Sequence, residues 1–362
     1  MTKAGDMAVD LAPVRECRNL AEAWRGLEAR ADCSFFQSWS WIGTWLAELP
    51  KRIDPLCLRA RLAGETVGLA LLTPYEARRH GFVTARQLHL HATGGEEDRL
   101  TVEHNGFLVD RRCAAGATTA LLRHLAGLDI WEELALPGVD PSMETTMAAL
   151  GRVILLQRSR CPHVDLSALG SGNYLDGLGA NTRHQLRRAH RLYGGPELDA
   201  AGDQESAAAF LAGLEELHDA RWRSAGKDGA FAGDFLKAFH RRLVMEGVAN
   251  DTVQLLRTRT GDGRTIGYLY NFLHRGRVYA YQSGFETPAD NRLKPGLVSH
   301  HLAIEMNRAA GRAVYDFLAG DSRYKRSLAN SASELVWLVV QRPAGKFRIE
   351  NLARALKSLL RA

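Results

Sequence analysis

NRLKPGLVSHHLAIEMNRAAG, residues 291–311, is the stretch that decides the fold. Pro295 and Gly296 stand where a helix must begin, because proline is favoured at the first helical position, where its missing N–H is no loss. Apolar residues then recur at helical spacing, and Gly311 is placed for a C-cap. The free N–H groups of the first turn, beside Lys294, predict an anion site, most often one for phosphate. A helix with a proline start and nothing bound is the alternative.

Strand-like runs flank this helix. RVYAYQSGF, residues 277–285, alternates like a half-buried strand, and AVYDFLAG, residues 313–320, is a short β-rich run. A strand, a helix and a strand within about 40 residues form a crossover unit, so the two strands are expected to be parallel. Ligands of open α/β sheets bind at the carboxyl ends of such strands, which favours the anion site. ELVWLVVQ, residues 334–341, predicts a further buried strand.

Two segments resemble each other and suggest a duplicated domain. Residues 59–69 contain GETVGL and residues 257–268 contain GRTIGY, and both read as a β-hairpin with a glycine-rich turn. Helix-like stretches precede both hairpins. A repeat near half the chain length predicts two domains, 1–165 and 166–362, although two hairpins can also be alike by chance.

Composition bounds the class of protein. The 362 residues are 46% hydrophobic and 24% charged, which is ordinary for a soluble globular chain. The net charge of +6 fits an anionic ligand, a nucleic acid or an anionic membrane and selects none of them. The five cysteines form no Cys-x-x-Cys pair, so neither zinc nor a disulfide framework is expected. Without an apolar leader or a membrane span, the expected location is the cytoplasm.

A basic helix is predicted between the two halves. In GLGANTRHQLRRAHRLYGGPELD, residues 177–199, Arg183, Arg187 and Arg191 share one helical face. Guanidinium groups match phosphate oxygens, so this face could clamp a phosphorylated substrate. A solvated basic helix explains the same pattern equally well.

The order of these features resembles the FemAB/CelD-like branch of the GNAT acyltransferase superfamily. The resemblance rests on Gly-x-Thr-Ile-Gly, VYAYQSGF, KPGL, YDFLAGD and YKR, and it is stronger over residues 170–345 than over 30–130, where FFQSWSWIGTWLAEL looks like the first-domain helix. It implies an α/β fold of tandem GNAT-like domains, each with a mixed central sheet flanked by helices. The first domain would be degenerate and face the acceptor, and the second would hold the chemistry.

The resemblance also implies a donor site. In GNAT folds the helix between the two central parallel strands receives the pyrophosphate of acyl-CoA at its N-terminus. The matching residues here are Arg292, Lys294, Pro295, Gly296, Leu297 and Val298. The fuller Gln/Arg-x-x-Gly-x-Gly form is missing. Acetyl-CoA or another acyl-CoA is the expected co-substrate, and no metal is expected, since His89 and His91 lack a third ligand in register.

Catalytic roles follow from the same resemblance. The strand end from Tyr281 to Gly284, with Tyr281 and Gln282 as the candidate residues, would aim a backbone N–H at the thioester oxygen. Asp316 would orient or deprotonate the amine, and Tyr324 would protonate the thiolate. Lys325 could instead stabilise the oxyanion, as the matching lysine is thought to do in the aminoacyltransferase relatives. The structural alternatives are an ion pair of Asp316 with Lys325 or Arg326 and simple packing of Tyr324.

The expected acceptor is an amino sugar or a saccharide intermediate of exopolysaccharide or cell-envelope biosynthesis. Trp39 and Trp222 could stack on a sugar, with Arg183 and Arg187 nearby, although core packing explains Trp39 as well. A first rival is an aminoacyl-tRNA-dependent peptidoglycan aminoacyltransferase, for which no coiled-coil arm is visible. A second is a non-catalytic nucleotide-binding regulator of polysaccharide export. No DNA partner is expected.

The tail RPAGKFRIENLARALKSLLRA, residues 342–362, predicts a basic amphipathic helix. Such a helix usually docks on its own domain. It could also make a peripheral contact with the inner membrane face.

Overall fold

The chain folds into two compact units. The computed structural model describes residues 7–79, 83–170 and 172–350. Unit 1 comprises residues 1–43, 49–158 and 335–362, and unit 2 comprises 44–48 and 159–334. Strands β7 (Arg152–Asp165) and β13 (Ser331–Gln341) each carry the chain from one unit to the other. The sequence predicted one boundary, at 165/166, and did not predict that residues 335–341 return to unit 1.

Unit 1 is an α/β sandwich built on a mixed sheet. Its elements are β1 (Met7–Pro13), α1 (Leu20–Glu28), α2 (Trp39–Glu48, whose last residues belong to unit 2), β2 (Leu56–Leu62), β3 (Glu65–Arg79), β4 (Val83–Leu90), β5 (Leu108–Val109), α3 (Ala114–Ala126), β6 (Glu133–Val139) and α4 (Ser142–Met147). The sheet order is β1-β2-β3-β4-β6-β13, with β4 and β6 parallel and α3 crossing between them. The strand predicted over residues 334–341 is present as part of β13, whose unit 1 part pairs with β6.

Unit 2 repeats this plan. Its elements are α5 (Ala180–Leu192), β8 (Glu197–Ala200), α6 (Gln204–Ser224), α7 (Asp234–Ala249), β9 (Val253–Arg259), β10 (Thr265–His274), β11 (Arg277–Phe285), α8 (Pro295–Ala309), β12 (Val314–Asp316) and α9 (Arg323–Leu328). The sheet order is β7-β12-β11-β10-β9-β8, and β12 alone runs parallel to its neighbour β11. The predicted crossover unit and its parallel strands are confirmed.

The duplication is visible in the element order. Each unit runs from a strand through two helices and three antiparallel strands to a helix and a strand parallel to the third. The two hairpins seen in the sequence are β2–β3 and β9–β10. The predicted fold class, tandem GNAT-like α/β domains with mixed sheets flanked by helices, is confirmed.

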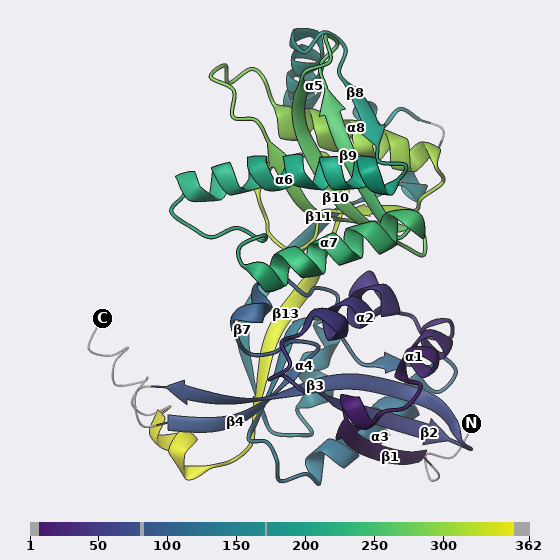
Figure 1. The fold of residues 1–362 in the computed structure, drawn as a ribbon, viewed down its shortest axis with the longest axis vertical. Helices are drawn as coiled ribbons and strands as arrows, with labels where there is room; N and C mark the ends of the chain where they lie inside the picture. The colour runs from purple at the N-terminus through teal and green to yellow at the C-terminus, as the bar shows by residue number, and fades with distance from the viewer. Residues whose placement is uncertain (1–6, 80–82, 171, 351–362) are drawn as a thin grey trace. The chain divides into compact units, whose positions relative to one another are not determined.

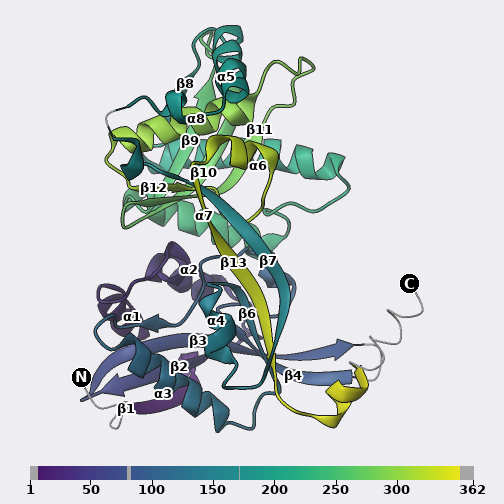
Figure 2. The ribbon, with the colours of Figure 1, turned by 180° about the vertical axis from the view of Figure 1, so that it is seen from behind.

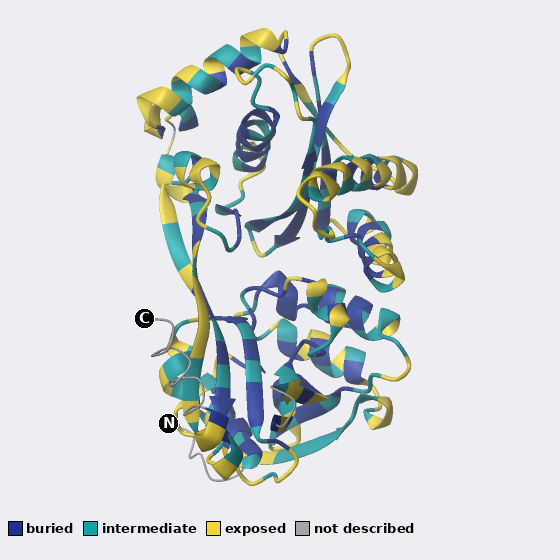
Figure 3. Ribbon diagram, turned by 90° about the vertical axis from the view of Figure 1, so that its left-hand side faces the viewer, coloured by how far each residue is buried: buried dark blue, intermediate teal, exposed yellow. Residues whose placement is uncertain are grey.

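Helices cover both faces of the unit 2 sheet. Figure 1 shows α6 and α7 in front of β9–β11, and Figure 2 shows α8 with α5 on the other face. In Figure 3 most of α8 is buried, because it lies between the sheet and α5. One apolar core joins α5, α8 and the strands, with Leu186, Val298 and Tyr315 among its fully buried members. This core holds the start of α8 in place.

The ends of α8 follow their sequence signals. Pro295 opens the helix behind the N-cap residue Lys294, and no side chain caps it among the described residues. Gly311 closes it with a φ of 71°, a conformation that glycine adopts without strain. The predicted helix is therefore confirmed, and its first-turn N–H groups are available to a ligand.

The two parallel strands separate beyond a short paired segment. The residues 277–279 of β11 pair with 314–316 of β12, and no pairing continues from there among the described residues. Tyr281 is an extra residue in the β10–β11 register, a β-bulge that turns the end of β11. The opening faces the first turn of α8, where the site is built.

Two expectations concern the membrane. No helix among the described residues is both long and apolar enough to span a bilayer. The predicted tail helix begins at residue 345, but residues 351–362 lie outside the described part of the chain.

Candidate functional site

A pocket of about 560 Å³ lies in unit 2 at the carboxyl ends of β11 and β12. It is lined by α5 (Asn181, Thr182, Gln185, Arg188), α6 (Arg221), the end of β11 (Phe285), the loop and first turn of α8 (Asn291, Leu293, Lys294, Pro295, Gly296, Leu297) and α9 (Arg323, Tyr324, Ser327). The predicted KPGL segment is thus part of its wall. The volume is in the range typical of small-molecule sites.

The charges of this pocket have one sign. Arg188, Arg221, Lys294 and Arg323 line it, and its described lining contains no carboxylate. None of these four side chains forms an ion pair with another described residue. Arg292, which was expected to bind the cofactor, pairs instead with Asp290 at 2.8 Å and does not line the pocket. Uncompensated cations in a concave site attract a polyanion.

The start of α8 adds backbone donors to these cations. The first intrahelical bond runs from the Val298 N–H to the Lys294 carbonyl, at 3.0 Å. The N–H groups of Gly296 and Leu297 therefore stand in the uncapped first turn, at the positive end of the helix dipole. Gly296 has a second role, because a Cβ there would lie 3.0 Å from the Phe285 ring. Its small size serves the packing of Phe285.

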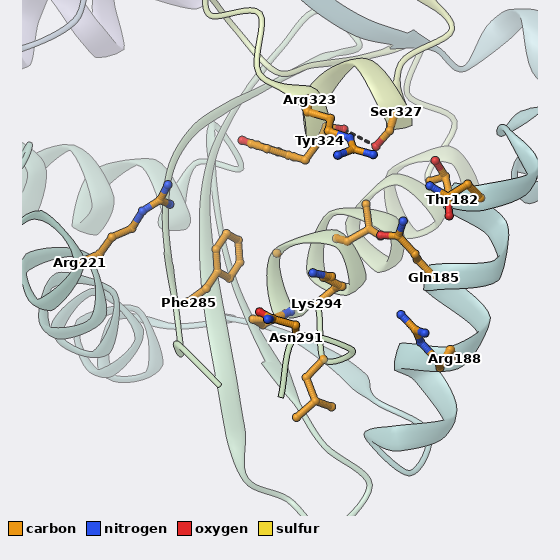
Figure 4. A pocket seen from close by; sticks show the side chains of 15 residues that line it. Thr182, Gln185, Arg188, Arg221, Phe285, Asn291, Lys294, Arg323, Tyr324 and Ser327 are labelled. Atoms are coloured by element: carbon orange, nitrogen blue, oxygen red, sulfur yellow. Dashed lines mark hydrogen bonds between the residues drawn. The ribbon is translucent and has the colours of Figure 1, made fainter. Parts of the chain in front are cut away.

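One face of α5 completes the pocket. Figure 4 shows Thr182, Gln185 and Arg188 along this face, opposite the start of α8. The predicted arginines lie elsewhere: Arg183 donates to the carbonyls of residues 176 and 178, and Arg187 is exposed. The lining residues recur at i, i+3 and i+6, a helical face that the sequence offered but that the arginine repeat obscured.

Tyr324 reaches the pocket from α9. Its side chain is 39% exposed, and its ring stacks on His300 with 5.6 Å between centroids. Partial burial raises the pKa of the Tyr324 hydroxyl, while the charge of Arg221 opposes this shift. Tyr324 therefore keeps its proton at neutral pH and can donate it.

Asp316 and Lys325 lie outside the pocket wall and hold a turn. Asp316 is fully buried, pairs with Arg277 at 2.7 Å and accepts the Leu318 N–H at 2.8 Å. Lys325 Nζ donates to the carbonyls of Leu318 and Ala319, at 3.3 and 2.7 Å. Leu318 has a φ of 63°, so these contacts stabilise a strained backbone after β12. An ion-paired buried carboxylate is a poor base, which argues against the expected role of Asp316.

Tyr281 and Gln282 also lie away from the pocket wall. Tyr281 is buried against Phe272, with ring centroids 4.6 Å apart, and Gln282 pairs with Tyr270 across the sheet. Phe285, which the sequence did not single out, reaches the pocket from the same strand. The β-bulge at Tyr281 shifts which side chains of β11 point to each face of the sheet. This shift explains why Phe285 lines the pocket and Tyr281 and Gln282 do not.

Three other residues that were predicted to bind a ligand pack against other side chains outside the pocket. Val298 is fully buried in the unit 2 core. Trp222 is half-buried, and its ring centroid lies 5.9 Å from that of His218. The ring centroids of Trp39 and Trp24 are 6.3 Å apart. None of the three lines the pocket. The described residues contain no group of three or more His, Cys, Asp or Glu side chains that could hold a metal.

Comparison with known proteins identifies the domain. Residues 180–326 match the family model described as acetyltransferase (GNAT) domain. No curated protein matches the chain. The crystal structure of FemX is similar with a TM-score of 0.57 at 12% identity, over 88% of this chain and 96% of that one. The structure of L-PGS from Bacillus licheniformis gives a TM-score of 0.54 at 9% identity, over 92% and 96%. At such identities the likeness shows a shared fold.

Proposed function

Because the chain carries a GNAT-type acyltransferase domain, we propose that it transfers an acyl group from acyl-CoA to an amine, with the donor bound in the unit 2 pocket. The observation that carries the proposal is the pocket wall. Four cations without ion-pair partners among the described residues and an uncapped helix start converge on one space of about 560 Å³. Pyrophosphate is the ligand chemistry that such a wall favours.

The pocket residues divide into two roles. Lys294, Arg188 and the first turn of α8 hold the phosphates, while the apolar side chains beside them contact the rest of the donor. Acyl-CoA supplies the activated thioester, whose carbonyl carbon the amine attacks as the C–S bond breaks. Tyr324 donates its hydroxyl proton to the departing sulfur, and the proton that the amine nitrogen loses returns through water to the Tyr324 oxygen.

Calorimetric titration of CoA and acetyl-CoA tests the donor site. Lys294→Glu replaces an attraction by a repulsion beside the phosphates, so we expect about a 100-fold weaker Kd, or roughly 2.7 kcal/mol. Arg292→Gln is the matched control, because Arg292 is already neutralised by Asp290. Failure of the wild-type protein to bind either compound would refute the acyl-CoA donor.

The acceptor we propose is an amino sugar or a saccharide intermediate of an envelope polymer or exopolysaccharide. It is supported by the CelD-type resemblance. Thiol release from acetyl-CoA in the presence of glucosamine and its N-acetylated form tests the claim. The N-acetylated sugar has no free amine, so only glucosamine should raise the rate of thiol release. An equal rise with both sugars would contradict transfer to the amine.

An aminoacyl-tRNA donor is the second candidate. Arg187 and Arg191 are exposed on α5 beside the pocket residue Arg188, so a longer polyanion could follow this helix. Competition separates the two donors: an acceptor-stem RNA should displace CoA from the pocket and should lose affinity in Arg187→Gln only if the donor is a tRNA. CoA binding with no turnover of any amine would favour the regulatory reading.

A further inference from the structure

We propose that unit 1 keeps a ligand site of its own, for a small, uncharged and mainly apolar molecule that donates one hydrogen bond to His89. The site is a pocket of about 270 Å³. It is lined by the end of β4, the residues after it, β6 and the unit 1 parts of β7 and β13. The inference stands independently of the donor site in unit 2.

The pocket lies where the fold places ligands. The residues 87–89 of β4 pair in parallel with 133–135 of β6, and the pocket is at the carboxyl end of this paired segment. The β6–β13 register shifts at Pro137 and Gly138, so that a bulge turns β6 at this point. Gly138 has a φ of 60°, and a Cβ there would lie 2.5 Å from the Val102 carbonyl oxygen. The opening is therefore built into the backbone.

The wall is mostly apolar and partly open. Leu100, Val102, Pro137, Leu156 and Trp337 are among its side chains. Leu156 is 65% exposed, which is unusual for a leucine on a strand. Binding of an apolar molecule would cover this wall and its exposed leucine, and removing that apolar surface from water stabilises the complex.

His89 provides a hydrogen-bond acceptor in this wall. The amide NH₂ of Gln87 donates to a Glu133 carboxylate oxygen at 2.7 Å, so the Gln87 oxygen faces His89 Nε2 at 2.8 Å. Nε2 therefore carries the proton, and Nδ1 keeps a lone pair. No hydrogen bond from Nδ1 to a described residue is present. Burial lowers the pKa of His89, while Asp98 and Glu133 oppose this shift.

The charge of the pocket disfavours an anion. Asp98 is its one carboxylate among the described lining residues. Its oxygens accept the Thr93 N–H at 2.5 Å, the Thr93 hydroxyl at 2.9 Å and the Gly94 N–H at 2.6 Å. A carboxylate so engaged offers little to a cation and repels an anion, so an uncharged ligand fits best. The pocket has about half the volume of the one in unit 2, which suits a small group.

Phenol and benzene test the proposal as a pair, because they differ by the hydroxyl that His89 would accept. We expect phenol to bind the full-length protein saturably, at least tenfold more tightly than benzene, in a titration followed by ¹H–¹⁵N correlation spectra. His89→Phe keeps a ring in place and should bring phenol to the level of benzene. His124→Phe, on α3 and outside the pocket, should change neither affinity.

A second variant tests the location. Leu156→Ser acts on an exposed side chain, so the fold should persist while both probes bind more weakly. Equal binding of phenol and benzene to the wild type would overturn the role of His89. Binding that Leu156→Ser leaves unchanged, or no saturable binding of either probe, would overturn the site. CoA binding in unit 2 is measured separately, so neither result bears on the donor proposal.

Discussion

The two units start their crossover helices in opposite ways. In unit 2 the first turn of α8 opens onto a pocket with four cations. In unit 1 the buried carboxylate of Asp110 stands just before α3 and pairs with Arg30 at 2.9 Å and with Arg112 at 2.6 Å. Neither helix has a side-chain cap among the described residues, but the arginines before α3 are paired with a carboxylate and the four pocket cations around the start of α8 are not.

The short helices that follow the second parallel strand of each unit also differ in their basic and aromatic side chains. In unit 2, α9 sends Arg323 and Tyr324 to the pocket. In unit 1, α4 has the sequence SMETTM, with neither a basic nor an aromatic side chain. One scaffold therefore occurs twice while the anion chemistry occurs in one copy, which shows that the fold alone does not determine function.

The largest effect is expected from Asp316→Ala. Removing this carboxylate leaves Arg277 without its partner and the turn at Leu318 without its hydrogen bond, so the free energy of unfolding should fall by about 3–5 kcal/mol. Denaturant unfolding measures the change, with Asp290→Ala, which removes a half-buried carboxylate, as control. A variant with intact stability and no turnover would restore Asp316 as a catalytic residue.

Tyr324→Phe should act on the reaction alone. The ring can still stack on His300, but the proton for the leaving sulfur is lost, so kcat should fall about 100-fold with the Kd for CoA unchanged. Since the pKa of Tyr324 lies above its usual value, the wild-type rate should not fall through loss of this proton between pH 6 and 9. Unchanged turnover would exclude Tyr324 as the proton donor. The short helix α9 of unit 2 would then, like α4 of unit 1, supply no proton donor.

Asp110→Asn tests the ion pairs that precede α3 in unit 1. It should lower the free energy of unfolding by about 2 kcal/mol and leave CoA affinity unchanged. Hydrogen bonds from Arg112 hold the pKa of Asp110 below its usual range, so its stabilisation is full above the unfolded pKa of about 3.9 and is lost as the pH falls through the folded value. The wild type should therefore lose more stability below pH 4 than the variant, as acid-unfolding curves would show.

The smallest effects compare neighbouring arginines of α5. Arg188→Gln removes one cation from the pocket and should weaken CoA about tenfold, while Arg187→Gln should change it less than twofold. Calorimetry at two salt concentrations measures both. The reverse pattern would mean that the anion follows the outer face of α5, as a tRNA would.

Much of the fold follows from local signals. The Pro-Gly start and the Gly311 end bound α8, and the alternation of residues 277–285 marks β11. These signals are local because a missing N–H, a positive φ and a two-residue period depend on a few neighbouring residues. The duplication is legible for the same reason, since two similar hairpins recur along the chain.

The site depended on contacts that sequence spacing does not record. Three arginines in register suggested one face of α5, yet packing against α8 turned a neighbouring face to the pocket. Asp316 and Lys325 matched a catalytic pattern, but they hold the turn at Leu318 and Ala319. Which ion pairs form is decided between residues far apart in the chain.

The sequence by itself determined the element types, the duplication, the parallel crossover and the position of an uncapped helix start at Lys294. The tertiary structure decided which cations stay without a carboxylate in the described chain, and so where an anion can bind. It also decided that Arg30 and Arg112 are paired with Asp110 just before the matching helix in unit 1. The reason is that the charge of a site is a sum over residues brought together by packing, and only the folded chain specifies that sum.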